Sequence, residues 1–368
     1  MTLKIRGVST LIKFGLPSRD NRIIFVAIMA FFGLSIFFWY HNILNVVALM
    51  IGLFLLLDIV FFWVTVFPYD RILSAVSCDG INWKKEHGIR MGIRRRNINH
   101  YGCVYYPVVI KNVDGYRMYF RGGDNFLDRI FTSYSRDGIV WSEEEEIRLD
   151  FACLGLKAVS SCAIISTPAF QRMYFSGNDG RDWKIYSAVS KDYLSWNMED
   201  GVRISNDSVF DSVFAKEPTV VESNGCLRMY YLGGDGRYNR ILGAFSFDGL
   251  NWEKTGVCIE PAMGEHPKCI KSPFIQRLDD STLRLYFAGG SNYPILHSVI
   301  LSAISSDGKS WKKEDGVRVG YDRRLDILEV LSPYVIADSG LLRMYYAGVG
   351  LHFLYPLTYF RYVRQKRL

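Results

Sequence analysis

The chain has 368 residues, of which 49% are hydrophobic and 15% aromatic. This composition allows a large core and excludes an intrinsically disordered chain. The formal net charge of +7 is modest for the length. It suits a face held near anionic lipid and is too weak to indicate a nucleic-acid partner.

Two long apolar stretches follow a basic N-terminal segment, residues 1–22. Residues 23–40 contain no charged side chain, and residues 43–67 contain one, Asp58. At about 1.5 Å per residue, a helix over either stretch is long enough to cross a hydrocarbon core of about 30 Å. Only two residues separate the stretches. The sequence therefore predicts a transmembrane hairpin of two helices over residues 23–67.

Basic residues predict the orientation of this hairpin. Residues 1–22 carry five basic side chains, and the two-residue loop carries no Lys or Arg. The positive-inside rule then places the N-terminus in the cytoplasm. Two crossings return the chain to the same side, so we expect an integral membrane protein with its C-terminal domain on the cytoplasmic face of the inner or plasma membrane. Seven cysteines without a CxxC or metal-type spacing favour reduced thiols, which fits that compartment.

Asp58 lies near the middle of the second stretch, where an ionised Asp costs about 2.5–3.5 kcal/mol. One interpretation is a contact with a polar lipid head group or with a partner helix, from another membrane protein or from a second copy of this chain. The other interpretation is a protonated Asp that is bonded within the hairpin, or an Asp that is tolerated because the helix shifts in the bilayer. The sequence leaves both open.

The rest of the chain repeats one motif, Ser-x-Asp-Gly-x-x-Trp. Four copies are intact and the copy that begins at Ser190 has Tyr193 in place of Gly. The five tryptophans are spaced by 58, 55, 56 and 59 residues: Trp83, Trp141, Trp196, Trp252 and Trp311. A period of this length indicates a repeat architecture.

Further motifs define the unit that repeats. An Arg-Met-Tyr-Phe type run precedes each later copy, and a segment with Pro lies about 11 residues before most of these runs. Both are short segments rich in aromatic and β-branched residues between Gly, Asp and Pro, which is typical of strands. A fourth strand is expected after the Trp, for example over residues 201–204 and 316–319. Four-stranded units at this period predict the blades of a β-propeller.

The order of the motifs predicts how the ring closes. The first unit, residues 71–92, has only its third and fourth strands, and the last unit, residues 331–348, has only its first and second. Together they make a fifth blade that joins the two chain ends in one sheet. The predicted fold is therefore all-β: a five-bladed propeller over residues 68–350, preceded by the hairpin. The remaining residues, 351–368, form an aromatic and basic tail that either adds a strand or rests on lipid head groups.

Residues that recur in every unit are interpreted as scaffold. The motif Asp accepts hydrogen bonds from turn amides, the Gly provides a positive φ, and the Trp packs between blades. Chemistry is expected instead from residues that differ between units at the start of the innermost strands, because these strands line the axis. The candidates are Tyr106, Lys216, Glu217, Lys271 and Glu329, together with His100, Asp211, His266 and Asp326.

The blade motifs resemble those of the five-bladed clan of glycosidases, which includes arabinanases, levansucrases and invertases (the glycoside hydrolase family 43, 32 and 130 type). The resemblance covers residues 71 to about 348. It implies that a Glu at the start of the third blade's inner strand is the general acid, and Glu217 matches that position. Glycosyl transfer needs two carboxyl groups, so Asp211 and Asp326 are the expected partners of Glu217. The clan's Asp on the first inner strand is replaced by Tyr106, so either the base has moved or hydrolysis has been lost.

We therefore expect a membrane-anchored enzyme that cleaves or transfers a glycosyl group in surface-polysaccharide or glycolipid metabolism. Its partners would be a sugar, glycan or lipid-linked sugar and membrane lipid. His100, Tyr106, Lys216, His266, Lys271 and Glu329 are the candidate substrate-binding residues. No cofactor is expected, and no spacing predicts a metal site. The alternative is an inactive propeller that binds glycan or organises a membrane complex.

Overall fold

A computed structural model of the protein describes residues 68–92, 103–124, 127–149, 155–266, 268–290, 298–321, 326 and 329–351, with Met29, Gly52 and Leu53. Pro68–His352 form one compact unit, which is almost entirely β in its described parts. No helix among the described residues has the length and apolar character needed to cross a membrane. The two predicted transmembrane stretches, apart from those three residues, lie outside the described residues, as do Asp58 and the tail after Leu351.

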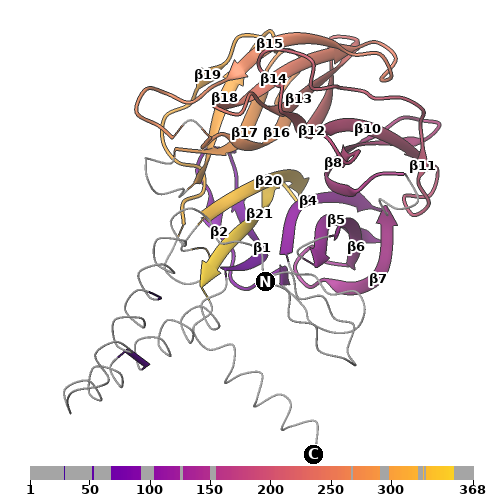
Figure 1. Ribbon diagram of the computed structural model, residues 1–368. Helices are drawn as coiled ribbons and strands as arrows, with labels where there is room; N and C mark the ends of the chain where they lie inside the picture. The colour runs from indigo at the N-terminus through magenta and orange to yellow at the C-terminus, as the bar shows by residue number, and fades with distance from the viewer. Residues whose placement is uncertain are drawn as a thin grey trace, which may run out of the picture. The chain divides into compact units, whose positions relative to one another are not determined.

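Most strands pair as antiparallel meanders of four, and Figure 1 shows these meanders arranged around a centre. The chain order is β4 (Cys103–Asn112), β5 (Gly115–Asp124), β6 (Leu127–Ser135) and β7 (Ser142–Leu149); β8 (Ala158–Ser166), β9 (Gln171–Asn178), β10 (Trp183–Ser190) and β11 (Asn197–Met198); β12 (Phe214–Ser223), β13 (Cys226–Gly234), β14 (Asn239–Ser246) and β15 (Glu253–Ile259); β16 (Lys271–Arg277), β17 (Leu283–Gly289), β18 (Val299–Ser305) and β19 (Lys312–Lys313). The second and third meanders share one sheet through a single parallel pair, Trp183 with Phe214.

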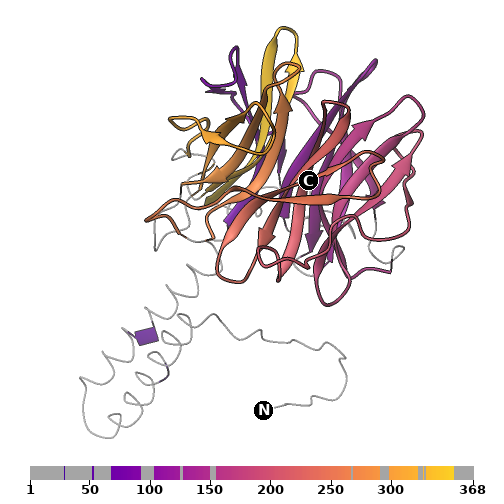
Figure 2. The ribbon, with the colours of Figure 1, turned by 90° about the horizontal axis from the view of Figure 1, so that it is seen from above.

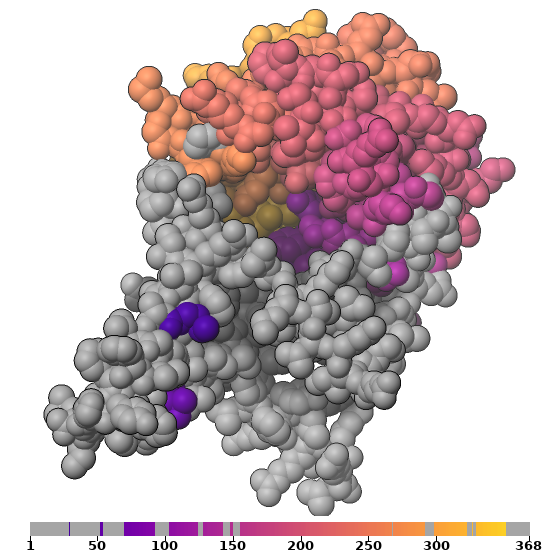
Figure 3. All heavy atoms as spheres, viewed as in Figure 1, coloured from indigo at the N-terminus to yellow at the C-terminus, as the bar shows by residue number. Residues whose placement is uncertain are grey.

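The two ends of the unit form one further sheet. It contains β20 (Glu329–Asp338) and β21 (Leu341–Leu351) from the end of the unit, and β1 (Pro68–Ser77), β2 (Lys84–Lys85) and β3 (Met91–Gly92) from its start. β1 pairs antiparallel with β21 over ten residues, from Pro68 opposite Leu351 to Ser77 opposite Leu342. Figure 3 shows the packed atoms of the unit in the view of Figure 1. The predicted closure of the chain ends in one sheet is confirmed.

The outermost strands differ from the prediction. In three sheets the fourth strand begins directly after the Trp and is two residues long, as β2, β11 and β19 show. Of the predicted residues 201–204 and 316–319, only Ile204 and Val319 make isolated bridges. The reason is local: Gly201 and Gly316 both have φ of 85°, which turns the chain away from the ladder.

Neighbouring meanders are joined by one recurring contact. The Tyr hydroxyl of the Arg-Met-Tyr run donates to the backbone carbonyl of the Gly in the next Ser-x-Asp-Gly turn, or of Tyr193 in the degenerate copy. The five pairs are Tyr119 with Tyr193, Tyr174 with Gly249, Tyr230 with Gly308, Tyr286 with Gly80 and Tyr345 with Gly138. The same tyrosines meet the Trp of that next motif edge to face. The last pair returns to the first meander, so the contacts form a closed cycle.

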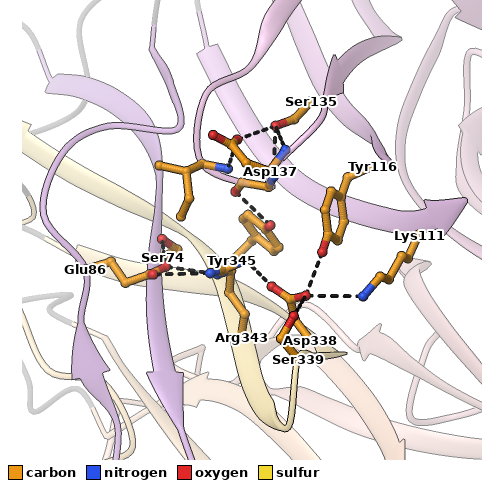
Figure 4. Close-up of polar contacts among 12 residues, drawn as sticks. Ser74, Glu86, Lys111, Tyr116, Ser135, Asp137, Asp338, Ser339, Arg343 and Tyr345 are labelled. Atoms are coloured by element: carbon orange, nitrogen blue, oxygen red, sulfur yellow. Dashed lines mark hydrogen bonds and ion pairs between the residues drawn. The ribbon is translucent and has the colours of Figure 1, made fainter. Parts of the chain in front are cut away.

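The motif residues are scaffold, as predicted. Asp79 Oδ1 accepts the amides of Ile81 and Asn82 at 2.8 Å, and the other motif aspartates repeat this pattern. Figure 4 shows further structural contacts at the place where the closing sheet meets the first meander. There Arg343 pairs with Glu86 and Asp338, and Asp338 accepts the hydroxyl of Tyr116 at 2.6 Å. These residues hold the ring together and leave its centre to others.

The strand directions define two faces of the unit. β4, β8, β12, β16 and β20 lie nearest the centre in Figure 1, and Figure 2 shows the strands from the side. We call the end at which these inner strands begin the mouth face. Because Glu329 of β20 lies opposite Val349 of β21, and Pro68 opposite Leu351, both ends of the unit leave at the mouth face. The Ser-x-Asp-Gly turns lie at the opposite end, the turn face.

Candidate functional site

Every inner strand contains a β-bulge at the same height. The register with the second strand shifts between Tyr105 and Val108 in β4, and at the matching place in β8, β12, β16 and β20. The bulged residue has φ of 53° to 57° at Tyr106, Glu217, Ser272 and Ser332. All four of these residues precede Pro, and Pro restricts the backbone of the residue before it. Positive φ without Gly is strained and marks a position that the surrounding structure enforces.

The bulges line a small pocket on the axis of about 40 Å³. Each inner strand contributes three consecutive residues, which begin at Tyr106, Ser161, Glu217, Ser272 and Ser332. One water needs about 10–15 Å³, whereas small-molecule pockets measure about 300–1,000 Å³. The pocket therefore has room for a few waters or a hydroxyl group and not for a sugar ring. Glu217 is the one acidic side chain among the described residues that line it.

Glu217 is buried, with 5% of its surface exposed, and it is held from three sides. Its carboxylate accepts the Tyr106 hydroxyl at 2.9 Å and the Ser272 amide at 2.7 Å, and its own amide donates to Ser176 Oγ at 2.8 Å. Burial, and then the neighbouring Glu217 carboxylate, hold the pKa of Tyr106 well above its usual value. Tyr106 therefore stays protonated and remains a hydrogen-bond donor to Glu217.

Charged residues lie beside Glu217 toward the mouth face. Lys216 Nζ lies 3.8 Å from Glu217 Oε1 and 4.6 Å from the centre of the Phe214 ring. Lys271, one residue before Ser272, pairs with Glu329, which also accepts Ser298 Oγ at 3.0 Å. From the predicted set, the structure thus brings Tyr106 and Lys216 to Glu217, and it brings Lys271 to Glu329.

The same region contains a carboxyl group that sequence reasoning missed, Asp70 on β1. Its exposed fraction is 6%, and Oδ1 has no hydrogen-bond partner among the described residues. Burial raises the pKa of Asp70 to about 6, and the nearby Glu329 also raises it, against a hydrogen bond from Tyr105 and the charge of Arg121. No comparison of inner strands could find it, because β1 is the third strand of its sheet.

Asp211 and Asp326 lie elsewhere. Neither lines the axial pocket, and both have no exposed surface. Asp211 Oδ2 accepts Tyr231 at 2.9 Å and Lys254 at 2.7 Å, while Ser208 satisfies Oδ1. Asp326 repeats this arrangement with Tyr346 at 3.4 Å and Lys85 at 2.6 Å. The structure therefore does not bring the three predicted carboxylates into one pocket.

A pattern in the sequence marks these two positions. Asp occupies this position in the two units whose Arg-Met-Tyr motif ends in Tyr-Tyr. In the same two units, a Lys follows the motif Trp two residues later. The other units have Phe as the second aromatic residue and lack this Asp. Each Asp also has a glycine packed against it. A Cβ at Gly233 would lie 3.1 Å from the Asp211 Cβ, and a Cβ at Gly348 would lie 2.8 Å from the Asp326 Cβ, so both positions leave little room for a side chain.

Of the two candidate histidines, one lies among the described residues. His266 lies in the turn before β16, where its Nδ1 accepts the Lys268 amide at 3.1 Å. His100 lies outside the described residues. Within the ranges that the structure describes, no group of three His, Cys, Asp or Glu side chains is placed to hold a metal ion. The six described cysteines are all free thiols.

Comparisons by sequence show a partial likeness. No family model matches the chain. Two uncharacterized proteins of Mycobacterium tuberculosis, MT1551 from strain CDC 1551 / Oshkosh and Rv1502 from strain ATCC 25618 / H37Rv, are each 30% identical over 141 residues. These residues are 36% of this chain and 46% of the relative, so the chain spans about half the length of either protein.

Solved structures show the fold. A BT0996 complex with RGII matches with a TM-score of 0.59 at 15% identity, over 79% of this protein and 93% of the other. A thermostable family-43 glycoside hydrolase gives 0.54 at 16% identity, over 67% and 88%. The endo-arabinase of Bacteroides thetaiotaomicron gives 0.51 at 14% identity, over 68% and 93%. The fold is thus the β-propeller type of glycoside hydrolases, as the motifs predicted.

Proposed function

We propose that this chain is a five-bladed propeller enzyme that cleaves or transfers a glycosyl group, with Glu217 at its reactive centre. One observation carries the proposal. The buried carboxylate of Glu217 faces the axial pocket and is held by donors from two other inner strands, Tyr106 of β4 and Ser272 of β16. Carboxyl groups fixed in this way are the proton donors and acceptors of glycosyl chemistry.

The pocket volume indicates where a sugar would bind. At about 40 Å³ the axial pocket admits only water or a hydroxyl group, so the ring would lie above it, at the mouth face. There Lys216 Nζ lies 3.8 Å from Glu217 Oε1, and Lys271, next to Ser272 in the chain, pairs with Glu329. We propose that Glu217 moves the proton at the reacting oxygen and that Glu329 is the second carboxylate, in place of Asp211 and Asp326. The lysines suit a phosphate-bearing donor.

We further propose that residues 23–67 anchor the enzyme and that the propeller faces the cytoplasm. The support is the basic segment 1–22, the two uncharged or nearly uncharged stretches, and the free thiols. A substrate available there is a nucleotide sugar, a sugar phosphate or a lipid-linked sugar, which fits surface-polysaccharide or glycolipid metabolism.

Replacing Glu217 with Gln tests the chemistry. With nucleotide sugars, aryl glycosides and lipid-linked sugars as substrates, we expect Glu217→Gln to lower turnover by about 10²–10⁴-fold, the usual share of a general acid or base. The matched control is Glu222→Gln on the exposed side of the same strand, which keeps full turnover. Turnover that survives in Glu217→Gln with the fold intact contradicts the proposal.

The second candidate is a propeller that binds glycan, or organises a membrane complex, without turnover. Tyr106 favours it, because a protonated phenol stands where the glycosidase clan has an Asp. Under this alternative no substrate in the panel is turned over by the wild type, and Glu217→Gln retains glycan binding measured by calorimetry.

A further inference from the structure

We infer that the mouth face docks on the surface of an anionic bilayer and that the axial site takes a lipid-linked sugar from it. This inference rests on the proposed function and narrows its substrate class. It joins two properties of the described unit: where its ends leave, and which side chains surround them.

The first observation is the position of both chain ends. Pro68 and Leu351 pair with each other at the mouth face, the same end at which β12 and β16 begin. The 67 residues before Pro68 include the predicted membrane stretch that ends at Phe67, and the 17 residues after Leu351 are aromatic and basic. Since β1 begins at Pro68, no linker separates that stretch from the mouth face. The predicted membrane stretch therefore joins the described unit at this face.

The second observation is a set of exposed apolar side chains on mouth-face loops. Val209, Phe210 and Val213 precede β12 and expose 75%, 38% and 49% of their surface, and Met263, before β16, is fully exposed. Soluble loops of this kind are normally polar. Apolar side chains on the face where the predicted anchor joins the unit are suited to the boundary between head groups and acyl chains.

Basic side chains accompany these residues. Arg237 and Lys268 are exposed. Val213 lies beside Gly236, the residue before Arg237, since a Cβ at Gly236 would lie 3.5 Å from the Val213 methyl group. The Arg240 guanidinium lies over the rings of Phe210 and Tyr238, at 5.4 and 4.9 Å from their centres. Arg240 is also paired with Asp235 at 2.7 Å, so the exposed Arg237 and Lys268 are the basic side chains that suit an anionic head-group layer.

The turn face carries ionised carboxylates. Hydrogen bonds from turn amides lower the pKa of all five motif carboxyls: Asp79, Asp137, Asp192, Asp248 and Asp307. The mouth face has carboxylates as well, since Lys184 lowers the pKa of Asp179 and Asp235 pairs with Arg240. Charge therefore does not separate the two faces, and the position of the chain ends decides which face meets lipid.

The consequence concerns the substrate. A site at the centre of a face pressed on lipid is reached most readily by a molecule whose sugar projects from the bilayer. A lipid-linked sugar presents its glycosyl group at that height, while the Lys216 ammonium group, 3.8 Å from Glu217, suits the phosphate that joins sugar to lipid.

Site-specific labelling of the full chain in vesicles tests the docking. Cys78 is an exposed thiol in a turn-face motif and accepts an environment-sensitive fluorophore in the wild type. The double variant Cys78→Ser, Met263→Cys moves the label to the mouth face at a side chain without packing contacts. Cys78→Ser alone gives the background. The vesicles contain phosphatidylcholine and phosphatidylglycerol, with or without nitroxide-labelled lipid.

We expect the label at residue 263 to shift to the blue and to be quenched by the nitroxide lipid, with neither change at Cys78. Quenching at both positions or at neither overturns the docking. A blue shift without quenching also overturns it, because the face is then covered by a protein. The measurement needs no turnover. Failure here leaves the Glu217 chemistry standing, and an active Glu217→Gln leaves the docking standing.

Discussion

Asp211 illustrates how a buried carboxylate is used for structure. It has no exposed surface, and its oxygens are bonded to Tyr231, Lys254 and Ser208. Such a group is stable in the interior because every lone pair that it buries has a partner. Its position seven residues before a Pro made it a catalytic candidate; its contacts assign it to the cohesion of one meander.

We expect Asp211→Asn to lower the free energy of unfolding by about 2 kcal/mol, because it removes charge-assisted hydrogen bonds from Lys254, which keeps Asp207 and the Ser205 carbonyl. Urea unfolding measures this change. Asp207→Asn, on the exposed partner of the same Lys254, is the control, with a loss below about 1 kcal/mol. Turnover per folded molecule stays at the wild-type level. A loss as large as that in Glu217→Gln would make Asp211 catalytic.

Asp70 gives the protein a predictable dependence on pH. Its pKa rises from 3.8 to about 6 in the fold, so folding favours the protonated form. The stability that this form contributes is fully present below pH 4 and is lost as pH rises through 6. A shift of about two units corresponds to roughly 3 kcal/mol.

Asp70→Asn removes this titration. We expect its free energy of unfolding, relative to that of the wild type, to increase by up to about 3 kcal/mol between pH 4 and pH 7.5. Denaturant unfolding at a series of pH values measures the difference, with Glu222→Gln on the surface as the control. A difference that stays constant across this range would show that Asp70 is ionised in the fold at low pH.

At the scale of elements, the strands were predictable because each carries a periodic signal. Aromatic and β-branched runs between Gly, Asp and Pro predicted the inner three strands, and the split units predicted the pairing of β1 with β21. The extent of the outermost strand was not predictable, since a Gly with positive φ interrupts it at Gly201 and Gly316. A pattern of residue types does not report where a backbone turns out of a ladder.

The candidate site was predictable only in part, for a geometric reason. Residues next to the inner-strand Pro share one bulge, so Tyr106, Glu217 and Ser272 meet at the axis as expected. Seven residues before the Pro, the chain runs through turns, such as the one from Ser208 to Asp211. Residues at the same distance from the Pro in different units therefore do not point in the same direction. Asp70 was missed because it reaches the site from another strand and from the other end of the unit.

At the scale of the whole unit, stability depends on closure. Each meander meets its neighbours through a Tyr–Gly hydrogen bond and a Trp–Tyr contact, and the cycle returns to its start through β1 and β21. In an open array a terminal repeat can unfold alone. In a closed one, losing the β1–β21 ladder exposes edges on both sides, so the unit is expected to unfold in one cooperative step.

Ala347→Pro tests this dependence. Ala347 lies in the middle of β21, opposite Ile72 of β1 and Leu331 of β20, and has no exposed surface. Pro there removes a ladder hydrogen bond and clashes with its neighbours, so we expect a loss of about 3 kcal/mol or more. Ala347→Gly is the control, at roughly 1 kcal/mol. Calorimetry should show one transition at a lower temperature in both variants, with the larger shift for Pro. If Ala347→Pro instead produced two separate transitions, the other meanders would be stable without closure. The pairing of the chain ends would then stabilise only its own sheet.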